Sequence, residues 1–306
     1  MAARVVVAAG QPGGAESTLQ CFDVVGWESG GRGGAAEGEL LRPCGQPVPA
    51  GIQAMYMDVH TTATGATVIY ALDINCAKHP TRGREKEGLV NAWAVGADGS
   101  LSLINSVPCG GITPCHCQLL RPPAGERGQT LLLVANYGDE ASGAPGLVSV
   151  FPILPSGELS PAAASRTVLE AAAGAASPED APRQLAPHPH MVTTDPDGDT
   201  VYLIDLGVNA ILGYRLSRDP IELSHEPVVK CVLHGGAGPR HLVSRHNIAG
   251  IWIAFFSRCQ RYLCGQVFHP TAPAAFTVNE LDSTVSVLSF DREKKHMISD
   301  YNSRLQ

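Results

Sequence analysis

The feature that most constrains the fold is a repeated strand and turn pattern in residues 186–216, which read APHPHMVTTDPDGDTVYLIDLGVNAILGYRL. The first two apolar runs are joined by Asp-Pro-Asp-Gly-Asp, a turn signal in which Gly198 is free to adopt a positive φ. A second turn at residues 206–209 leads into the next run. The pattern predicts an antiparallel meander with strands at residues 190–194, 200–205, 210–216 and 228–233.

The same unit recurs along the chain. Its second-strand signal is found at residues 5–10, 68–73, 131–136, 201–205 and 275–279. Each copy is followed by a turn and an alternating strand, as in residues 146–152 and 283–289, where one side chain in two is apolar. Four-stranded units that bury their faces against their neighbours around an axis form a β-propeller. We therefore predict an all-β chain, about five blades and a single β-propeller domain over residues 1–306.

Charge and composition limit the classes of binding partner and the cellular compartment that we expect. The net charge of −7 disfavours nucleic acid or an anionic membrane as the main partner. The apolar run near the N-terminus is too short for a signal peptide, so we expect a cytoplasmic protein. The nine cysteines have scattered spacings, and we expect reduced thiols, several of them in the core.

Two segments rich in glycine, proline or alanine are expected to be loops. Residues 26–51 contain many glycines and carry Trp27 and Cys44, which predicts a surface loop. Residues 161–182 are rich in alanine, but their glycine and prolines favour a loop over a helix.

The fifth unit departs from the repeat. His116 and His190 precede a turn proline by six residues, whereas Arg240 precedes Pro270 by 30, an excess of 30 − 6 = 24 residues. Removal of residues 243–266 restores the spacing, so we predict an atypical insertion there. Two explanations stay open, a translated retained intron and a genuine surface insertion, which loops tolerate well.

Four stretches together resemble the lactonase family of seven-bladed β-propellers, which includes the bacterial type of 6-phosphogluconolactonase and the fungal carboxy-cis,cis-muconate cyclase. They are PCH at 114–116 with LLLVANYG at 131–138, RQLAPHPH at 183–190 with DPDG at 195–198, GAGPRH at 236–241, and VNELDSTV at 278–285. Their order along residues 113–290 makes the resemblance specific. Members of that family carry two further blades after the last stretch, so the resemblance implies a C-terminally truncated, incompletely closed propeller.

Three side chains that can be cationic are expected at the start of the innermost strand of three consecutive blades: His116, His190 and Arg240. Innermost strands line the central channel, so these groups should face one pocket that suits an anion. Arg240 can bind a phosphate or carboxylate with two hydrogen bonds, and a histidine can transfer a proton near neutral pH. The competing interpretation is that they bond backbone groups at a crowded rim.

Glu280 is a further candidate, as a general base. Asp73, Asn136, Asp205 and Asn279 occupy aligned positions in their blades, and we expect them to cap turns. Glu280 directly follows Asn279, whereas the residue after each of the other three is apolar or aromatic. The resemblance supports a role for this glutamate in the site. Arg183 and Gln184 lie in a family-like stretch and are secondary candidates for substrate binding.

Metal chemistry is not expected. Strand alternation places Cys115 and Cys117 on the face opposite His116, and no second pair lies at a suitable spacing, so we predict neither metal nor cofactor.

The resemblance implies hydrolysis of a phosphorylated sugar lactone of the pentose phosphate pathway, by activation of water in the central channel. Catalysis is assigned to Glu280, His190 and Arg240, and substrate binding to His116, Arg183 and Gln184. Two alternatives remain open: a lactonising enzyme like the carboxy-cis,cis-muconate cyclase, and a non-catalytic propeller that serves as a binding scaffold.

Overall fold

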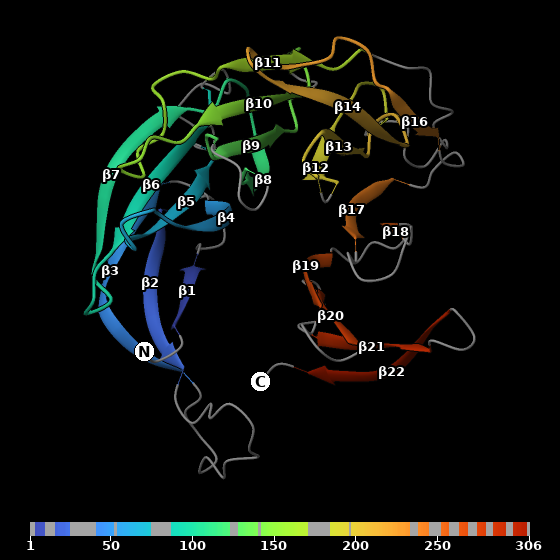
Figure 1. Ribbon diagram of the computed structural model, residues 1–306. Coiled ribbons are helices and arrows are strands. Elements are labelled where there is room, and N and C mark those ends of the chain that lie inside the picture. Colours follow the sequence, from blue (N-terminus) through green and yellow to red (C-terminus); the bar gives the residue numbers. More distant parts are fainter. Residues whose placement is uncertain are drawn as a thin grey trace. The chain divides into compact units, whose positions relative to one another are not determined.

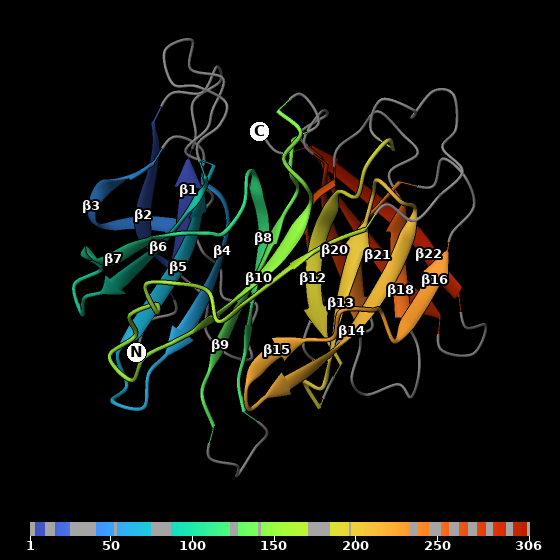
Figure 2. The ribbon, with the colours of Figure 1, turned by 90° about the horizontal axis from the view of Figure 1, so that it is seen from above.

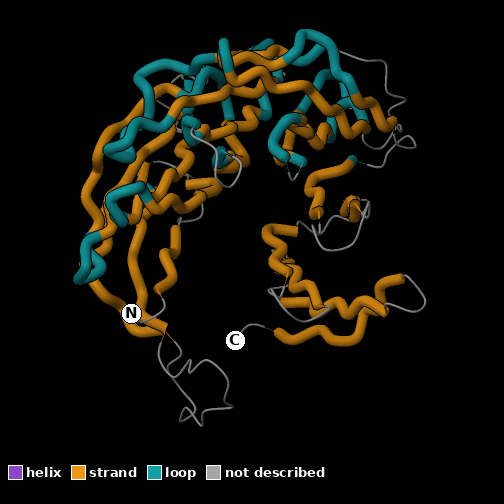
Figure 3. The backbone as a smooth tube through the Cα atoms, viewed as in Figure 1, coloured by secondary structure: helices purple, strands orange, loops and turns teal. Residues whose placement is uncertain are grey.

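The structure is a computed structural model, and its secondary structure contains strands and no helix among the described residues (Figure 3). It describes residues 4–9, 16–24, 41–51, 54–74, 87–122, 128–139, 142–170, 184–195, 197–232, 238–244, 252–256, 263–268, 274–279, 284–291 and 296–304. Within these ranges, no helix combines the length and apolar character that crossing a bilayer requires.

The chain divides into two compact units, Met1–Ala254 and Phe255–Gln306. The first unit contains β1 (Arg4–Ala9), β2 (Ser17–Val24), β3 (Leu41–Gly51), β4 (Ala54–Thr61), β5 (Thr67–Asp73), β6 (Leu89–Val95), β7 (Leu101–Pro108), β8 (Pro114–Leu120), β9 (Leu131–Asn136), β10 (Leu147–Pro152), β11 (Ser165–Val168), β12 (Pro189–Thr194), β13 (Thr200–Asp205), β14 (Ala210–Arg218), β15 (Ile221–Leu223), β16 (Val229–Val232) and β17 (Pro239–Ser244) (Figure 1). β18 (Trp252–Phe256) crosses the boundary between the units. The second unit contains β19 (Leu263–Phe268), β20 (Ala274–Asn279), β21 (Thr284–Asp291) and β22 (His296–Arg304).

The predicted meanders are confirmed. The sheets β4-β5-β6-β7, β11-β10-β9-β8 and β19-β20-β21-β22 each have four antiparallel strands, and β12 to β16 form the sheet that contains residues 186–216. The described part of every predicted second-strand signal lies in a strand, and all but the first of these strands, β1, are second in their sheets. The turn between β12 and β13 also has its predicted form: Gly198 has φ +74° and donates its N–H to the carbonyl of Asp195 at 3.1 Å.

The predicted loop at residues 26–51 is wrong at its C-terminal end, because residues 41–51 form β3. Proline removes a backbone donor and is therefore tolerated mainly in edge strands. β3 is the edge of the sheet β1-β2-β3, and its Pro43 and Pro49 stand opposite Phe22 and Thr18 of β2. The loop expected at residues 161–182 likewise contains a strand, β11, which pairs with β10.

The described residues form six sheets, one more than the repeats counted in the sequence, because the fifth repeat is divided between two of them. β17, which contains Arg240, pairs with β18, whereas β20 pairs with its own first strand, β19. The segment 243–266 thus contains β18 and the beginning of β19. Its status as an insertion stays a prediction.

The core lies between the faces of consecutive sheets, as a propeller requires. Leu133 and Val148 of the sheet β8–β11 pack with Val192 and Leu203 of the next sheet, and all four are fully buried. Two further buried clusters join the sheet β8–β11 to β4–β7, and β4–β7 to β1–β3. In Figure 2 the strands β8, β9 and β10 run beside β12, β13 and β14. This stacking places the first strands of neighbouring sheets next to one another.

Candidate functional site

The first strands β4, β8 and β12 each contain a register shift near their beginning. In β8 the shift falls at Cys115, and in β12 it falls at His190. His116 stands opposite Ala135, the residue before the end of β9, and Met191 stands opposite Ile204, the residue before the end of β13. The counterpart of His116 in β12 is therefore Met191 and not His190. The expectation that His116 and His190 occupy equivalent positions is therefore wrong by one residue, because the prolines used to align them lie at different distances from the strands: Pro122 follows Leu119 by three residues, whereas Pro196 follows its counterpart Thr194 by two.

His190 and Arg240 are nevertheless brought together. Nη1 of Arg240 lies 2.9 Å from Nε2 of His190, so β17 and β12 meet at this point. A guanidinium can only donate hydrogen bonds, so Nε2 of His190 accepts and carries no proton. The imidazole is therefore neutral, and its own proton resides on Nδ1.

His241 connects this pair to His116. Its ring centroid lies 5.4 Å from that of His190 and 6.0 Å from that of His116, with the second pair in an edge-to-face arrangement. The ring of Tyr56, on β4, lies 4.1 Å from His116. Tyr56, His116, His190, Arg240 and His241 thus form one group contributed by four first strands, which we call the inner histidine cluster.

Burial makes two of the histidines poor bases. It lowers the pKa of His116 to about 3, with a smaller contribution from His241, and it lowers the pKa of His241 to about 4, with a contribution from Arg240. Both imidazoles are therefore neutral at pH 7. Within the cluster the positive charge lies on Arg240, and the imidazoles supply hydrogen-bonding nitrogens instead of the additional positive charge that the sequence suggested. Among the described groups, Nδ1 of His116 is buried and has no hydrogen-bond partner.

The strand that carries His190 is anchored by a buried carboxylate. Oδ1 of Asp205, at the end of β13, accepts backbone N–H groups of His188 at 2.8 Å, Gly207 at 2.8 Å and Val208 at 3.0 Å. Burial raises the pKa of Asp205 to about 6, and these three hydrogen bonds oppose that rise. The predicted turn-capping role of this aligned position is confirmed at Asp205.

His188 adds a second anchor, to the neighbouring sheet. Its Nδ1 lies 2.8 Å from the carbonyl oxygen of Tyr137, and its ring stacks on that of Tyr137 with centroids 4.2 Å apart. The Tyr137 ring also lies 6.2 Å from His190. Tyr137, which directly follows β9, thus contacts the rim of the inner histidine cluster.

Gln184, a predicted substrate-binding residue, is held by hydrogen bonds within the protein. Its Nε2 donates to Oδ1 of Asn209 at 2.7 Å and to the carbonyl of Leu206 at 3.3 Å, and the residue is 7% exposed. Asn209 Oδ1 also accepts the N–H of Gly238 at 2.7 Å. Gln184 and Asn209 therefore fix the backbone two residues before Arg240.

Two of the predicted site residues, Arg183 and Glu280, lie outside the described residues. Tyr56 and His241 were missed by sequence reasoning. A signal for His241 was available, since it directly follows Arg240 in GAGPRH, whereas nothing local marks Tyr56 because it reaches the cluster from another sheet.

The prediction for the cysteines of β8 is wrong in one respect. Cys115 packs toward the following sheet, where its Sγ lies 3.3 Å from the carbonyl of Pro189, whereas Cys117 is buried against the preceding one. The bulge at Cys115 breaks the alternation, so the two thiols face opposite sides. Among the described side chains, no group of three or more histidine, cysteine or acidic residues could hold a metal ion.

The comparisons with known proteins agree with this architecture. The model of the family described as "Lactonase, 7-bladed beta-propeller" matches residues 41–302. The 6-phosphogluconolactonase of Bacillus subtilis (strain 168) is 26% identical over 206 residues, which are 67% of this chain and 46% of that enzyme. The chain spans about half the length of the curated relatives it matches.

Solved structures show the same fold. A Bacteroides fragilis protein described as a 6-phosphogluconolactonase superposes with a TM-score of 0.64 at 18% identity, over 99% of this chain and 82% of that one. The periplasmic gluconolactonase of Pseudomonas aeruginosa gives a TM-score of 0.65 at 16% identity, over 98% and 82% of the two chains. With a family match that covers most of its length and a fold shared with these structures, the chain belongs to the lactonase family of seven-bladed β-propellers.

Proposed function

We propose that this protein hydrolyses a phosphorylated sugar lactone, with the inner histidine cluster as its site. The observation that carries the proposal is the hydrogen bond between Arg240 and His190, surrounded by the neutral imidazoles of His116 and His241. One fixed positive charge beside uncharged imidazoles that can donate or accept hydrogen bonds suits an anionic ester. The names of the curated relatives, 6-phosphogluconolactonase, support the same substrate class.

Substrate binding would start the reaction at Arg240. The phosphate of the lactone attracts the guanidinium, which can engage two of its oxygens at once. That movement releases Nε2 of His190, whose lone pair then accepts a proton from water. The water oxygen attacks the lactone carbonyl carbon, and N–H groups of the neighbouring imidazoles donate to the developing oxyanion. When the ring C–O bond breaks, the proton returns to the leaving oxygen, and a hydroxy acid is released.

Glu280 is the second candidate for the base. It follows Asn279, the last residue of β20, as Tyr137 follows the last residue of β9, and Tyr137 contacts the rim of the cluster. The variants Glu280→Gln and His190→Asn separate the two assignments. The true base is the one whose replacement removes turnover while leaving the binding of the product acid unchanged.

Hydrolysis can be measured by proton release at constant pH, with the hydroxy acid identified by NMR. A phosphorylated and an unphosphorylated sugar lactone should differ mainly in KM, because Arg240 recognises the phosphate. The muconate cyclase reaction is tested in parallel with a tricarboxylated diene substrate. Binding of the phosphorylated product without turnover of either substrate would overturn the proposal in favour of a binding scaffold.

A further inference from the structure

Two cysteines stand directly opposite each other in the first sheet. Cys21 of β2 and Cys44 of β3 are partners in the antiparallel ladder. Residues paired in this way have Cα atoms about 4.5 or 5.5 Å apart and side chains on the same face. Both separations lie within the range of roughly 4.4–6.8 Å that a disulfide spans. Neither cysteine is disulfide-bonded in the structure.

Both side chains face the neighbouring sheet β4–β7. Cys21 is 1% exposed and belongs to the buried cluster with Ile69, Trp93 and Leu101, and the half-buried Cys44 packs against the same cluster. The turn between β6 and β7 covers Cys44 closely, since a Cβ on Gly99 would lie 2.7 Å from its Sγ. The packing of two sheets therefore holds both thiols on one side of β2 and β3.

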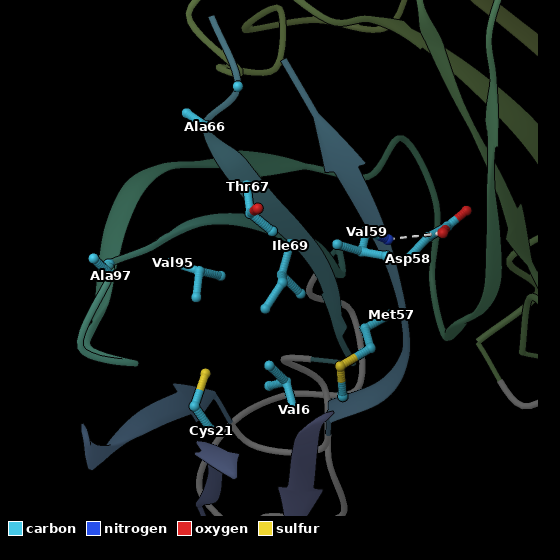
Figure 4. Close-up of a pocket in the computed structure, with 12 residues that line it drawn as sticks. Val6, Cys21, Met57, Asp58, Val59, Ala66, Thr67, Ile69, Val95 and Ala97 are labelled. Atoms are coloured by element: carbon cyan, nitrogen blue, oxygen red, sulfur yellow. Dashed lines mark hydrogen bonds between the residues drawn. The ribbon is translucent and has the colours of Figure 1, made fainter. Parts of the chain in front are cut away.

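A cavity lined in part by Cys21 lies beside this pair. It has a volume of about 740 Å³, and Val6, Cys21, Met57, Ile69 and Val95 point toward it from strands of both sheets (Figure 4). Its acidic residue, Asp58, is engaged elsewhere, because its carboxylate accepts the N–H groups of Val59 at 2.7 Å and Leu119 at 2.8 Å. A cavity with mainly apolar walls, whose one carboxylate is held by two backbone N–H groups, has room for a small neutral oxidant such as hydrogen peroxide.

We propose that Cys21 and Cys44 form a redox-active thiol pair that hydrogen peroxide converts to a cross-strand disulfide. One thiolate attacks a peroxide oxygen, the O–O bond breaks, and a sulfenic acid and one water result. The second thiolate attacks the sulfenic sulfur and releases the second water, so two thiols and one peroxide give one disulfide and two waters. A dithiol reductant reverses the change. The inference does not depend on hydrolase activity.

The consequence is a covalent link between β2 and the edge strand β3, which are separated in sequence by the glycine-rich residues 25–40. A bond that closes this loop constrains the unfolded chain. Oxidation should therefore stabilise the sheet β1-β2-β3, whose strand β3 contains prolines and lies at an edge.

The test uses the intact protein treated with hydrogen peroxide, then alkylated and digested with trypsin without reduction. Cys21 lies in the tryptic peptide of residues 5–32, and Cys44 lies in that of residues 33–78, because trypsin does not cut between Arg42 and Pro43. We expect these peptides to be linked in the oxidised sample and separated by dithiothreitol. Trivalent phenylarsine oxide, which bridges two adjacent thiols, should protect both cysteines from alkylation.

Controls exclude the other cysteines. Cys76 lies in the same tryptic peptide as Cys44, so the link must persist in Cys76→Ser and disappear in Cys44→Ser. Cys231→Ser removes an exposed thiol of β16 and should change nothing. The proposal is overturned if the folded wild-type protein keeps both thiols alkylatable after oxidation, or if Cys21 links to a cysteine other than Cys44. Because the wild-type measurement is decisive, it does not depend on the folding of the variants.

Discussion

Arg240 and His190 share one hydrogen bond across two sheets, with Nη1 of the guanidinium 2.9 Å from Nε2 of the imidazole. The contact keeps His190 neutral and fixes its tautomer. It also keeps the arginine at the centre of a group whose other described nitrogen bases, His116 and His241, are uncharged at neutral pH. An anion that displaces His190 from Arg240 would therefore free both a charge and a base in one step.

Replacement of Arg240 tests this arrangement. Arg240→Lys keeps a positive charge but loses the planar fork, and we expect kcat/KM for a phosphorylated lactone to fall roughly 10-fold to 100-fold, with most of the change in KM. Arg240→Ala should lose still more. Steady-state kinetics with the phosphorylated and unphosphorylated lactones measure the effect, which should be smaller for the latter.

The matched control is Arg215, which is exposed on β14 and takes no part in the cluster. Arg215→Lys should leave both kinetic constants unchanged. Equal losses for the two lysine variants would show that the effect of Arg240→Lys arises from general loss of folded protein and not from phosphate recognition.

The buried His116 predicts a pH dependence of stability. Its pKa is about 3 in the folded protein and near 6.5 in the unfolded chain, so between these values the unfolded state binds the extra proton. The free energy of unfolding should therefore fall as the pH is lowered from about 6.5, by up to about 1.4 kcal/mol per pH unit for this group.

Urea unfolding between pH 7.5 and pH 4.5 measures this slope. His116→Phe keeps a ring against Tyr56 and removes the titrating group, so its slope should be smaller by about one proton. A variant slope as steep as that of the wild type would assign the acid sensitivity to other groups.

Asp205 predicts the opposite pH effect and a strong packing effect. Its pKa of about 6 exceeds its value in the unfolded chain, so ionisation between about pH 4 and pH 6 reduces stability as the pH rises. Asp205→Asn retains an oxygen for the three N–H groups and should lie within about 1 kcal/mol of the wild type at pH 7. Asp205→Ala leaves those buried donors unpaired and should cost roughly 3 kcal/mol or more.

Asn136 indicates why the asparagine variant should be tolerated, since it ends β9 as Asp205 ends β13 and is also fully buried. Urea unfolding of both variants at pH 5 and pH 7.5 tests the assignment. If Asp205→Ala were as stable as Asp205→Asn, the carboxylate would not be what holds the entry to β12.

The repeating strands could be predicted because their signals are local. A largely apolar run that ends in Asn or Asp marks β5, β9, β13 and β20, and each is a strand in the structure. β3 was missed because its prolines and glycines resemble those of a loop, and only its position at a sheet edge explains why they are tolerated.

The site was less accessible to sequence reasoning. His116, His190 and Arg240 were identified, and they do meet in one cluster. The contribution of Tyr56 depends on packing between sheets, which has no sequence period. The bulge in β8 also cannot be read from alternation, and it decides the directions of Cys115 and Cys117.

Asn209 provides a test of how Arg240 is positioned. It has φ +52°, is 1% exposed, and its Oδ1 accepts the N–H of Gly238 at 2.7 Å, two residues before Arg240. Asn209→Gly keeps the backbone conformation and loses the acceptor, whereas Asn209→Ala loses the acceptor and adds strain in the left-handed region.

Both variants should therefore lose kcat/KM by a similar factor, roughly tenfold, if Asn209 acts by holding the entry to β17. Their stabilities should differ, with the alanine variant lower by about 1 kcal/mol. Asn209→Asp keeps an oxygen acceptor and a residue type that tolerates this φ, so it should retain more activity than either. Kinetics and urea unfolding on the same preparations separate positioning from strain: a glycine variant with unchanged kcat/KM would show that Arg240 is held by contacts other than this hydrogen bond.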